Sequence, residues 1–343
     1  MEELIKIKEQ IEPLLTIFFD DKIARASKID PSSKEMIELL KEFTLRGGKR
    51  IRAALVYHGY TLFQPPNNEI LKPAMATELI HSFLLIHDDI IDQDNTRRNG
   101  PTIHASYEKL FNSKHYGTSF AILAGDILHA FANEILANSN FPDKNKNLAI
   151  KSLNTTVTKV IYGESLDVLS SINPNFSKKD LELTHYLKTA SYTVEGPLHL
   201  GAILAGATEE QLKILSKYGI PLGKAFQLQD DILGLFGDEE KLGKPVGSDI
   251  KEGKKTLLIL KALESATEEQ KQFLQSTLNK KDITKEEIDR VRDIVKQTKS
   301  LEHSQTTAKQ LIQEAKEAIT PLKDSESKQF LIELADYMLE RTI

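Results

Sequence analysis

Residues 70–94 read ILKPAMATELIHSFLLIHDDIIDQD and contain the longest helical pattern in the chain. Apolar residues recur there every three or four positions, which is the period of an α-helix. They form one stripe, with Leu71, Met75, Leu79 and Ile86 among its members. We therefore expect a long helix that buries this stripe and carries an acidic cluster at its C-terminal end.

The same period recurs along nearly the whole chain of 343 residues, while strand-like alternation is short. Clusters of Pro, Gly, Asn and Ser mark the breaks between helices. They lie at residues 30–33, 64–68, 99–101, 140–142, 173–175 and 243–245. Because no linker is long enough to separate two domains, the sequence predicts one all-α domain, residues 1–343, of about ten to thirteen helices.

The composition is that of an ordinary soluble globular protein, with 40% hydrophobic and 28% charged residues. The formal net charge of −5 gives no indication of a nucleic-acid partner. The chain has no cysteine, so neither a disulfide nor a thiolate metal site can form. Its first residues carry charges throughout, unlike a signal peptide, and no stretch approaches the ~18 consecutive apolar residues of a membrane span. We therefore expect a cytoplasmic protein without a transmembrane segment.

The first acidic cluster is HDDIIDQD, residues 87–94. Asp88 and Asp92 are four residues apart, so their carboxylates lie on one face of the helix, where like charges repel. Acids at the C-terminal end of a helix also oppose its dipole. A lone acidic run of this kind is usually a solvated helix end.

A second acidic pair makes that simple interpretation less satisfactory. In FQLQDDIL, residues 226–233, Asp230 and Asp231 again end an apolar helix, and Gln227 lies three residues before Asp230. Two such pairs require a cation, and ligands that offer only oxygen favour a hard ion such as magnesium, which also shares phosphate oxygens. No His-Glu-x-x-His pattern offers a zinc site. Magnesium that bridges a diphosphate is therefore the interpretation we favour.

Several basic residues suit the same anionic ligand. Residues 47–48 are both glycine, and Lys49 and Arg52 are expected on one face of the helix that follows, where free amides and the helix dipole also attract anions. The adjacent Arg97 and Arg98 point in different directions, so each can serve a different phosphate group. Further cations are Lys188, Lys244, Lys254 and Lys255. Each alone is an ordinary surface cation, but together with the acids they indicate chemistry whose leaving group is diphosphate.

In their order along the chain, these motifs resemble those of the trans-isoprenyl diphosphate synthases, the polyprenyl synthetase family. The matching motifs are GGKRIR at 47–52, DDIID at 88–92, RR at 97–98, KT at 188–189, QLQDD at 227–231 and GKPVGSD at 243–249. The resemblance covers nearly the whole chain and implies a helical bundle around a central cavity, the isoprenoid synthase fold. It implies a magnesium-dependent prenyltransferase that joins isopentenyl diphosphate head-to-tail, in trans, to an allylic diphosphate (dimethylallyl, geranyl or farnesyl). The family is usually a homodimer.

The resemblance also implies roles for single residues. Those expected to hold isopentenyl diphosphate are Lys49, Arg52, His81 and Arg98. Those expected to ligate three magnesium ions on the allylic diphosphate are Asp88, Asp92 and Asp230, with Asp89 and Asp231 as supports. Those expected to contact that same diphosphate are Arg97, Lys188, Lys244 and Lys254. Lys188, Thr189 and Gln227 are the expected catalytic residues, the last two through oxygens directed at the developing carbocation.

In this interpretation, metal ions and cations stabilise the charge that develops as the allylic carbon–oxygen bond breaks, and a closed apolar pocket excludes water. The departing diphosphate is implied to take the proton, so we nominate no protein base and expect His87 and His104 to be structural or orienting. Phe83 lies five residues before Asp88, where an aromatic residue of the family forms the floor of the product tunnel; ordinary core packing is a nearly equal alternative. With Leu84 beside it, the pattern resembles geranylgeranyl diphosphate synthases of the archaeal type.

Two positions depart from the family pattern. The second acidic motif usually ends in a third aspartate, but Gly234 stands there, and Asp238 is not carried over as a ligand. Residues 99–101 read Asn-Gly-Pro where many relatives have Gly-Lys-Pro, so a lysine is missing. Neither change removes a residue on which the chemistry depends, and a contribution of Asp94 or Asp238 to metal binding stays open.

Other functions are compatible with parts of this pattern. A farnesyl or longer polyprenyl diphosphate synthase would differ only in product length. A terpene cyclase shares the helical fold and the first acidic motif but needs no isopentenyl site, so Lys49, Arg52 and Arg98 would be surplus. A non-catalytic partner subunit would commonly have lost the acidic clusters, which are present here.

Overall fold

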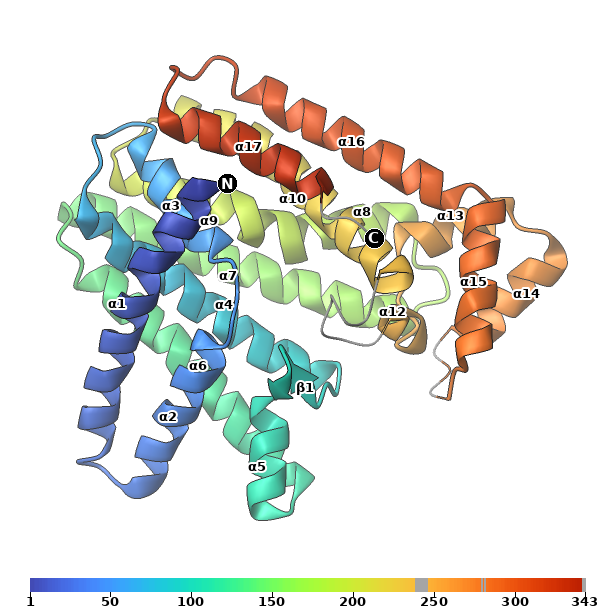
Figure 1. Ribbon diagram of the computed structural model, residues 1–343, viewed down its shortest axis with the longest axis horizontal. Helices are drawn as coiled ribbons and strands as arrows, with labels where there is room; N and C mark the ends of the chain where they lie inside the picture. The colour runs from blue at the N-terminus through green and yellow to red at the C-terminus, as the bar shows by residue number, and fades with distance from the viewer. Residues whose placement is uncertain (238–245, 279, 281, 341–343) are drawn as a thin grey trace. The chain divides into compact units, whose positions relative to one another are not determined.

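The protein is almost entirely helical (Figure 1), as the sequence predicts. The computed structural model describes residues 1–237, 246–278, 280 and 282–340. The chain divides into two units, Met1–Leu153 with Pro197–Thr208 and Asn154–Gly196 with Glu209–Ile343. Both the single domain and the central cavity stay predictions.

The first unit is built mainly on α4 and the helices that cover it. Its elements are α1 (Glu2–Ala26), α2 (Pro31–Leu45), α3 (Ile51–Thr61), η1 (Asn68–Ile70), α4 (Leu71–Ile91), β1 (Thr96–Arg97), β2 (Gly100–Pro101), α5 (Ile103–Phe111) and α6 (Lys114–Ala137). The beginning of α7 (Asp143–Ile172) and nearly all of α9 (Gly196–Leu204) also belong to it.

Helix α4 lies where the apolar stripe predicts it. It packs against α6 and α3, and Leu79 and Ile86 are completely buried. Burying a side chain of this size contributes about 1.5–3 kcal/mol, so the stripe anchors the helix firmly in the core. The acidic residues at the end of α4 therefore start from a rigid element.

A two-residue hairpin follows α4, and the sequence analysis did not foresee it. Strands β1 and β2 pair antiparallel, with Thr96 opposite Pro101 and Arg97 opposite Gly100. The two turn residues, Arg98 and Asn99, have φ of 50° and 60°, as the tight turns of two-residue hairpins require. Asparagine tolerates this left-handed region better than most residues, which is the only local signal for the turn.

The second unit is built around α10. Its elements are most of α7, α8 (Lys178–Thr184), the π-helix η2 (His185–Glu195), α10 (Glu209–Phe236), α12 (Ser248–Lys251), α13 (Leu257–Ser265), α14 (Glu268–Thr277), α15 (Lys285–Gln297), α16 (Ser300–Ala318) and α17 (Glu326–Glu340). Helix α10 packs against η2, α16 and α17 (Figure 1). The C-terminal end of α10 joins α12–α15 through a cluster of buried apolar residues. Ile232, Leu235, Leu258 and Val291 belong to this cluster.

Reciprocal caps fix where three of these helices begin. In each, the side chain of a Ser or Thr at the N-cap accepts a hydrogen bond from the backbone N–H of the residue three positions later. The side chain of that later residue accepts in return from the backbone N–H of the Ser or Thr. The pairs are Ser177 with Asp180, Thr267 with Gln270, and Thr284 with Glu287. Short capped helices of this kind explain why the described residues hold more helices than the ten to thirteen expected.

Helix α6 is the one helix among the described residues that is long and apolar enough to cross a membrane by length and composition. It packs closely against α4 and α5, and Ala121, Ala124 and Leu128 are fully buried. The core helix of a soluble protein meets the same criterion, so this is weak evidence for a membrane span.

Candidate active site

In the first unit, Arg97 pairs with two aspartates of the first acidic cluster. Its Nε donates to Asp89 Oδ1 at 2.5 Å, and its Nη2 donates to Asp88 Oδ2 at 3.2 Å. Burial raises the pKa of Asp89 to about 7, although the Arg97 charge acts in the opposite direction. Asp89 Oδ2 accepts no hydrogen bond within the described part of the chain. Asp92 is the C-cap residue with helical backbone angles, so Asp88 and Asp92 share one face as predicted.

The hairpin directs Arg98 away from Arg97 and toward the glycine loop. Arg98 Nη1 donates to the carbonyl oxygens of Arg46 at 3.0 Å and Gly47 at 3.4 Å. Gly48 has a φ of 101°, and a Cβ there would lie 3.3 Å from the Arg98 guanidinium. The loop therefore requires glycine for its backbone conformation, and its close contact with Arg98 leaves little room for a side chain.

Helix α3 begins two residues later than the anion site predicted from the sequence requires. Its N-cap is Arg50 and its first residue is Ile51, so Lys49 precedes the helix and does not share a helical face with Arg52. Arg50 is buried, donates to Glu78 Oε2 at 3.3 Å and to the Thr44 carbonyl at 2.9 Å, and fixes the loop. The sequence analysis gave Arg50 no role.

His81 lies on α4 among these arginines. Burial lowers the pKa of its imidazole well below the usual value, and the charges of Arg52 and Arg98 lower it further. The side chain is therefore neutral at physiological pH. It lies two helical turns before Asp88, so the predicted isopentenyl and metal residues start from the same helix.

In the second unit, a chain of hydrogen bonds links the π-helix to α10. Thr189 Oγ1 donates to Gln227 Oε1 at 2.5 Å, and Gln227 Nε2 donates to Asp231 Oδ1 at 2.8 Å. Burial and then the nearby Asp249 raise the pKa of Asp231 well above its usual value. The imidazole of His185, whose pKa burial lowers to about 4, approaches Asp231 Oδ2 at 3.6 Å.

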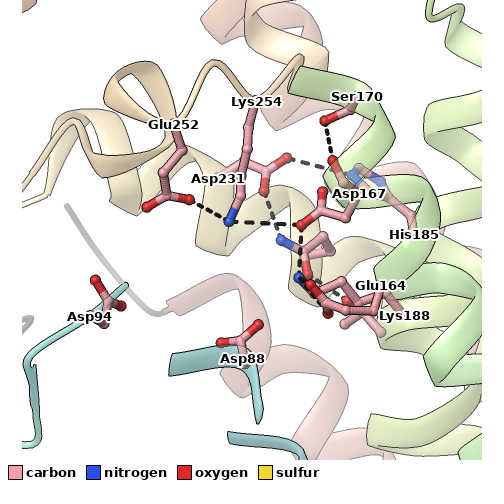
Figure 2. A network of polar contacts seen from close by, with 12 residues as sticks. Asp88, Asp94, Glu164, Asp167, Ser170, His185, Lys188, Asp231, Glu252 and Lys254 are labelled. Carbon is pink, nitrogen blue, oxygen red and sulfur yellow. Dashed lines mark hydrogen bonds and ion pairs between the residues drawn. The ribbon is translucent and has the colours of Figure 1, made fainter. Parts of the chain in front are cut away.

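Two lysines of the second unit form a network with carboxylates (Figure 2). Lys188 on η2 lies 2.8 Å from Glu164 and 2.7 Å from Asp167, both on α7. Lys254, after α12, lies 3.7 Å from Asp167 and 2.6 Å from Glu252. The sequence analysis missed all three acids. The only signal for the pair on α7 is their spacing of three, which places them on one helical face.

Helix α7 reaches η2 this closely because residue 163 is glycine. A Cβ there would lie 2.3 Å from the backbone nitrogen of Lys188, which no side chain tolerates. The position of Lys188 is thus set by backbone contact as well as by its ion pairs.

Phe83 and Leu84 lie on α4. Phe83 is buried, and its ring contacts His87 with centroids 4.8 Å apart and His129 of α6 at 5.4 Å. Leu84 is half-buried. His87 also approaches Asp126 of α6 at 3.8 Å, which suits the structural role predicted for it.

The model of the polyprenyl synthetase family matches residues 33–296 of this chain. The chain belongs to the polyprenyl synthetase family. Within that family it is 36% identical over 293 residues to a short chain isoprenyl diphosphate synthase from Methanocaldococcus jannaschii, covering 85% of this chain and 81% of the relative. It is 33% identical to a geranylgeranyl diphosphate synthase from Saccharolobus solfataricus, covering 95% and 98%.

Solved polyprenyl synthetases share the fold. A crystal structure of a geranylgeranyl pyrophosphate synthase from Corynebacterium glutamicum, complexed with isoprenyl diphosphate and magnesium, superposes with a TM-score of 0.92 at 32% identity, covering 98% of this chain and 99% of that one. The all-α class, the family and the prenyltransferase activity predicted from the sequence are thereby confirmed. The protein is an enzyme of isoprenoid biosynthesis.

For this polyprenyl synthetase, the structure brings the predicted site residues together within each unit. Asp88 and Arg97 pair at the end of α4, Arg98 binds the glycine loop, and His81 lies two turns earlier on α4 under the influence of Arg98. In the second unit, Thr189 and Gln227 join Asp231. Lys244 and Asp238 lie outside the described residues. The roles of the individual residues stay predictions.

Proposed function

We propose that this enzyme condenses isopentenyl diphosphate with an allylic diphosphate to give geranylgeranyl diphosphate and diphosphate. The observation that carries the proposal is the set of charged groups that the motifs bring together within each unit. In the first unit, arginines and a neutral histidine lie near the acidic cluster that ends α4. In the second unit, Lys188 and Lys254 pair with Asp167 of α7. Relatives named as geranylgeranyl diphosphate synthases support this product over a shorter one.

Lys49, Arg52, His81 and Arg98 are proposed to hold isopentenyl diphosphate. Arg98 is already anchored to the glycine loop, so its guanidinium is oriented before the substrate arrives. Because His81 is neutral, it binds a phosphate oxygen as a hydrogen-bond donor without adding charge.

Asp88, Asp92 and Asp230 are proposed to ligate magnesium, three ions in all. Among the described residues, no three carboxylate or imidazole side chains are close enough to hold a metal alone. Such an arrangement fits magnesium, which keeps several waters and takes further oxygens from a phosphate ligand. The Asp89 oxygen without a hydrogen bond is a further acceptor for metal-bound water. When bound, magnesium supplies positive charge to the departing diphosphate.

The allylic diphosphate is proposed to contact Arg97, Lys188, Lys244 and Lys254. In the network of Figure 2, three carboxylates (Glu164, Asp167 and Glu252) outnumber the two ammonium groups of Lys188 and Lys254. A free diphosphate would meet net negative charge there. We infer that it binds as a magnesium complex, whose cations offset that excess.

The residues then guide ionisation and coupling. Lys188 stabilises charge on the leaving group, while the oxygens of Thr189 and Gln227 favour the allylic cation. Orientation of the two reactants can contribute about 7–11 kcal/mol to lowering the barrier. The departing diphosphate takes the proton lost from the coupled product, so no side chain acts as general base.

Phe83 is proposed to limit product length, because its bulky ring is buried on α4 five residues before Asp88 and packs against His129 of α6. A homodimer is proposed as well. Large apolar side chains are exposed on α5 and α6, namely Leu110, Phe111, Tyr116 and Leu123, and a second copy of the chain would cover them. We propose a cytoplasmic location.

Mass spectrometry of products tests the proposal, with each allylic primer and isopentenyl diphosphate, with and without magnesium. Geranylgeranyl diphosphate formed only with magnesium is the expected result. A hydrocarbon released from an allylic diphosphate alone would indicate a terpene cyclase. A purified protein without turnover that stimulates another synthase would indicate a non-catalytic subunit.

A further inference from the structure

One carboxylate in the second unit contacts two lysine ammonium groups (Figure 2). Asp167 Oδ2 lies 2.7 Å from Lys188 Nζ and 3.7 Å from Lys254 Nζ. Since both distances start at the same oxygen, the two nitrogens lie at most about 6.4 Å apart. Lys188 comes from η2 and Lys254 from the segment after α12, so Asp167 joins two elements that are distant in sequence.

Two ammonium groups this close repel each other. All three side chains are only 18–23% exposed, so water and salt screen the repulsion weakly. Between the two lysines, Asp167 is the shared counter-charge: Glu164 pairs with Lys188, and Glu252 pairs with Lys254. Without Asp167, each lysine would move toward its own acid.

We propose that Asp167 is a positioning residue for the allylic diphosphate. It sets the separation of Lys188 and Lys254, so that both ammonium groups donate to one diphosphate. The inference rests on the proposed function, which assigns both lysines to that ligand. Its physical basis is preorganisation: a site whose donors are already in place loses less conformational freedom when the ligand binds.

The test compares Asp167→Asn with Glu164→Gln as a matched control. Both residues lie on α7, one turn apart, and each substitution removes one negative charge beside Lys188. The two differ in that Asp167 also contacts Lys254. The measurements are the KM of the allylic diphosphate, the inhibition constant of inorganic diphosphate with magnesium, the KM of isopentenyl diphosphate, and thermal unfolding.

For Asp167→Asn, we expect the allylic KM and the diphosphate inhibition constant to rise about tenfold, while the isopentenyl KM stays within about twofold. Glu164→Gln should raise the same two constants clearly less, because it leaves the contact of Asp167 with both lysines in place. Asp167→Glu, which retains the charge, should recover a large part of the loss.

Equal effects of Asp167→Asn and Glu164→Gln would overturn the inference, because they would show that charge alone matters. A parallel rise of both KM values with a lower unfolding temperature would also overturn it and indicate a structural role. A wild-type protein that turns over no allylic primer would instead refute the proposed function, and the inference with it.

Discussion

Replacing Gly163 by alanine tests whether the close approach of α7 to η2 positions Lys188. The added Cβ would lie 2.3 Å from the Lys188 nitrogen and 2.7 Å from its Cα, whereas ordinary contacts are 3.4–4 Å. One of the two backbones must therefore move by about 1 Å. Overpacking of this kind costs about 1–3 kcal/mol, and a misplacement of about 1 Å can lower a rate 10²-fold.

We expect Gly163→Ala to lower kcat/KM for the allylic diphosphate by about 10- to 100-fold. The KM of isopentenyl diphosphate should change little, because its proposed site lies in the first unit. Steady-state kinetics with each substrate varied in turn measures both kinetic constants. Chemical denaturation measures the loss of unfolding free energy. Ser165→Ala is the matched control, since Ser165 lies on the exposed face of the same helix.

Wild-type kinetics and stability in Gly163→Ala would refute this reasoning. They would mean that the two helices separate without cost and that Lys188 is positioned by its ion pairs alone. Lost stability with unchanged kinetics would show that the contact supports the fold only.

Three further predictions concern the first unit. Phe83→Ala should lengthen the product by one or more isoprene units in mass spectra, and unchanged length would remove Phe83 as the limit. Lys49→Ala should raise the KM of isopentenyl diphosphate and leave that of the allylic substrate unchanged; the reverse pattern would contradict its assignment. Burial raises the pKa of Asp89 from 3.8 to about 7, so between these pH values the folded protein binds more protons than the unfolded chain. The free energy of unfolding of the metal-free protein should therefore fall as pH rises through that range. Asp89→Asn should reduce this fall in denaturation experiments with a chelator, and an identical pH profile would contradict the role of Asp89.

The sequence predicts the features that depend on local pattern. Helix α4 and both acidic pairs follow from periodicity and spacing, because helical geometry alone places residues four apart on one face. The order of the motifs predicts the family, since each motif adds a group whose chemistry suits diphosphate or its metal.

Features that depend on tertiary contacts escape the sequence. Glu164 and Asp167 have an ordinary spacing on α7, and only the approach of η2 shows that they hold Lys188. The π-helix has no local sequence signature, because its packing depends on other helices: a Cβ at Gly163 of α7 or Gly223 of α10 would lie 2.3 or 2.4 Å from its backbone. Arg50 was similarly overlooked, since its role depends on Glu78 of another helix.

The proposed reaction requires Asp88 and Asp230 to act on one magnesium diphosphate. Calorimetry tests this requirement by measuring how inorganic diphosphate with magnesium binds to wild-type protein, Asp88→Ala, Asp230→Ala and the double variant. We predict that each single substitution abolishes most of the magnesium-dependent binding and that the double variant loses little more, because both residues serve one ligand. Independent losses that add in the double variant, or full binding in either single variant, would contradict the account.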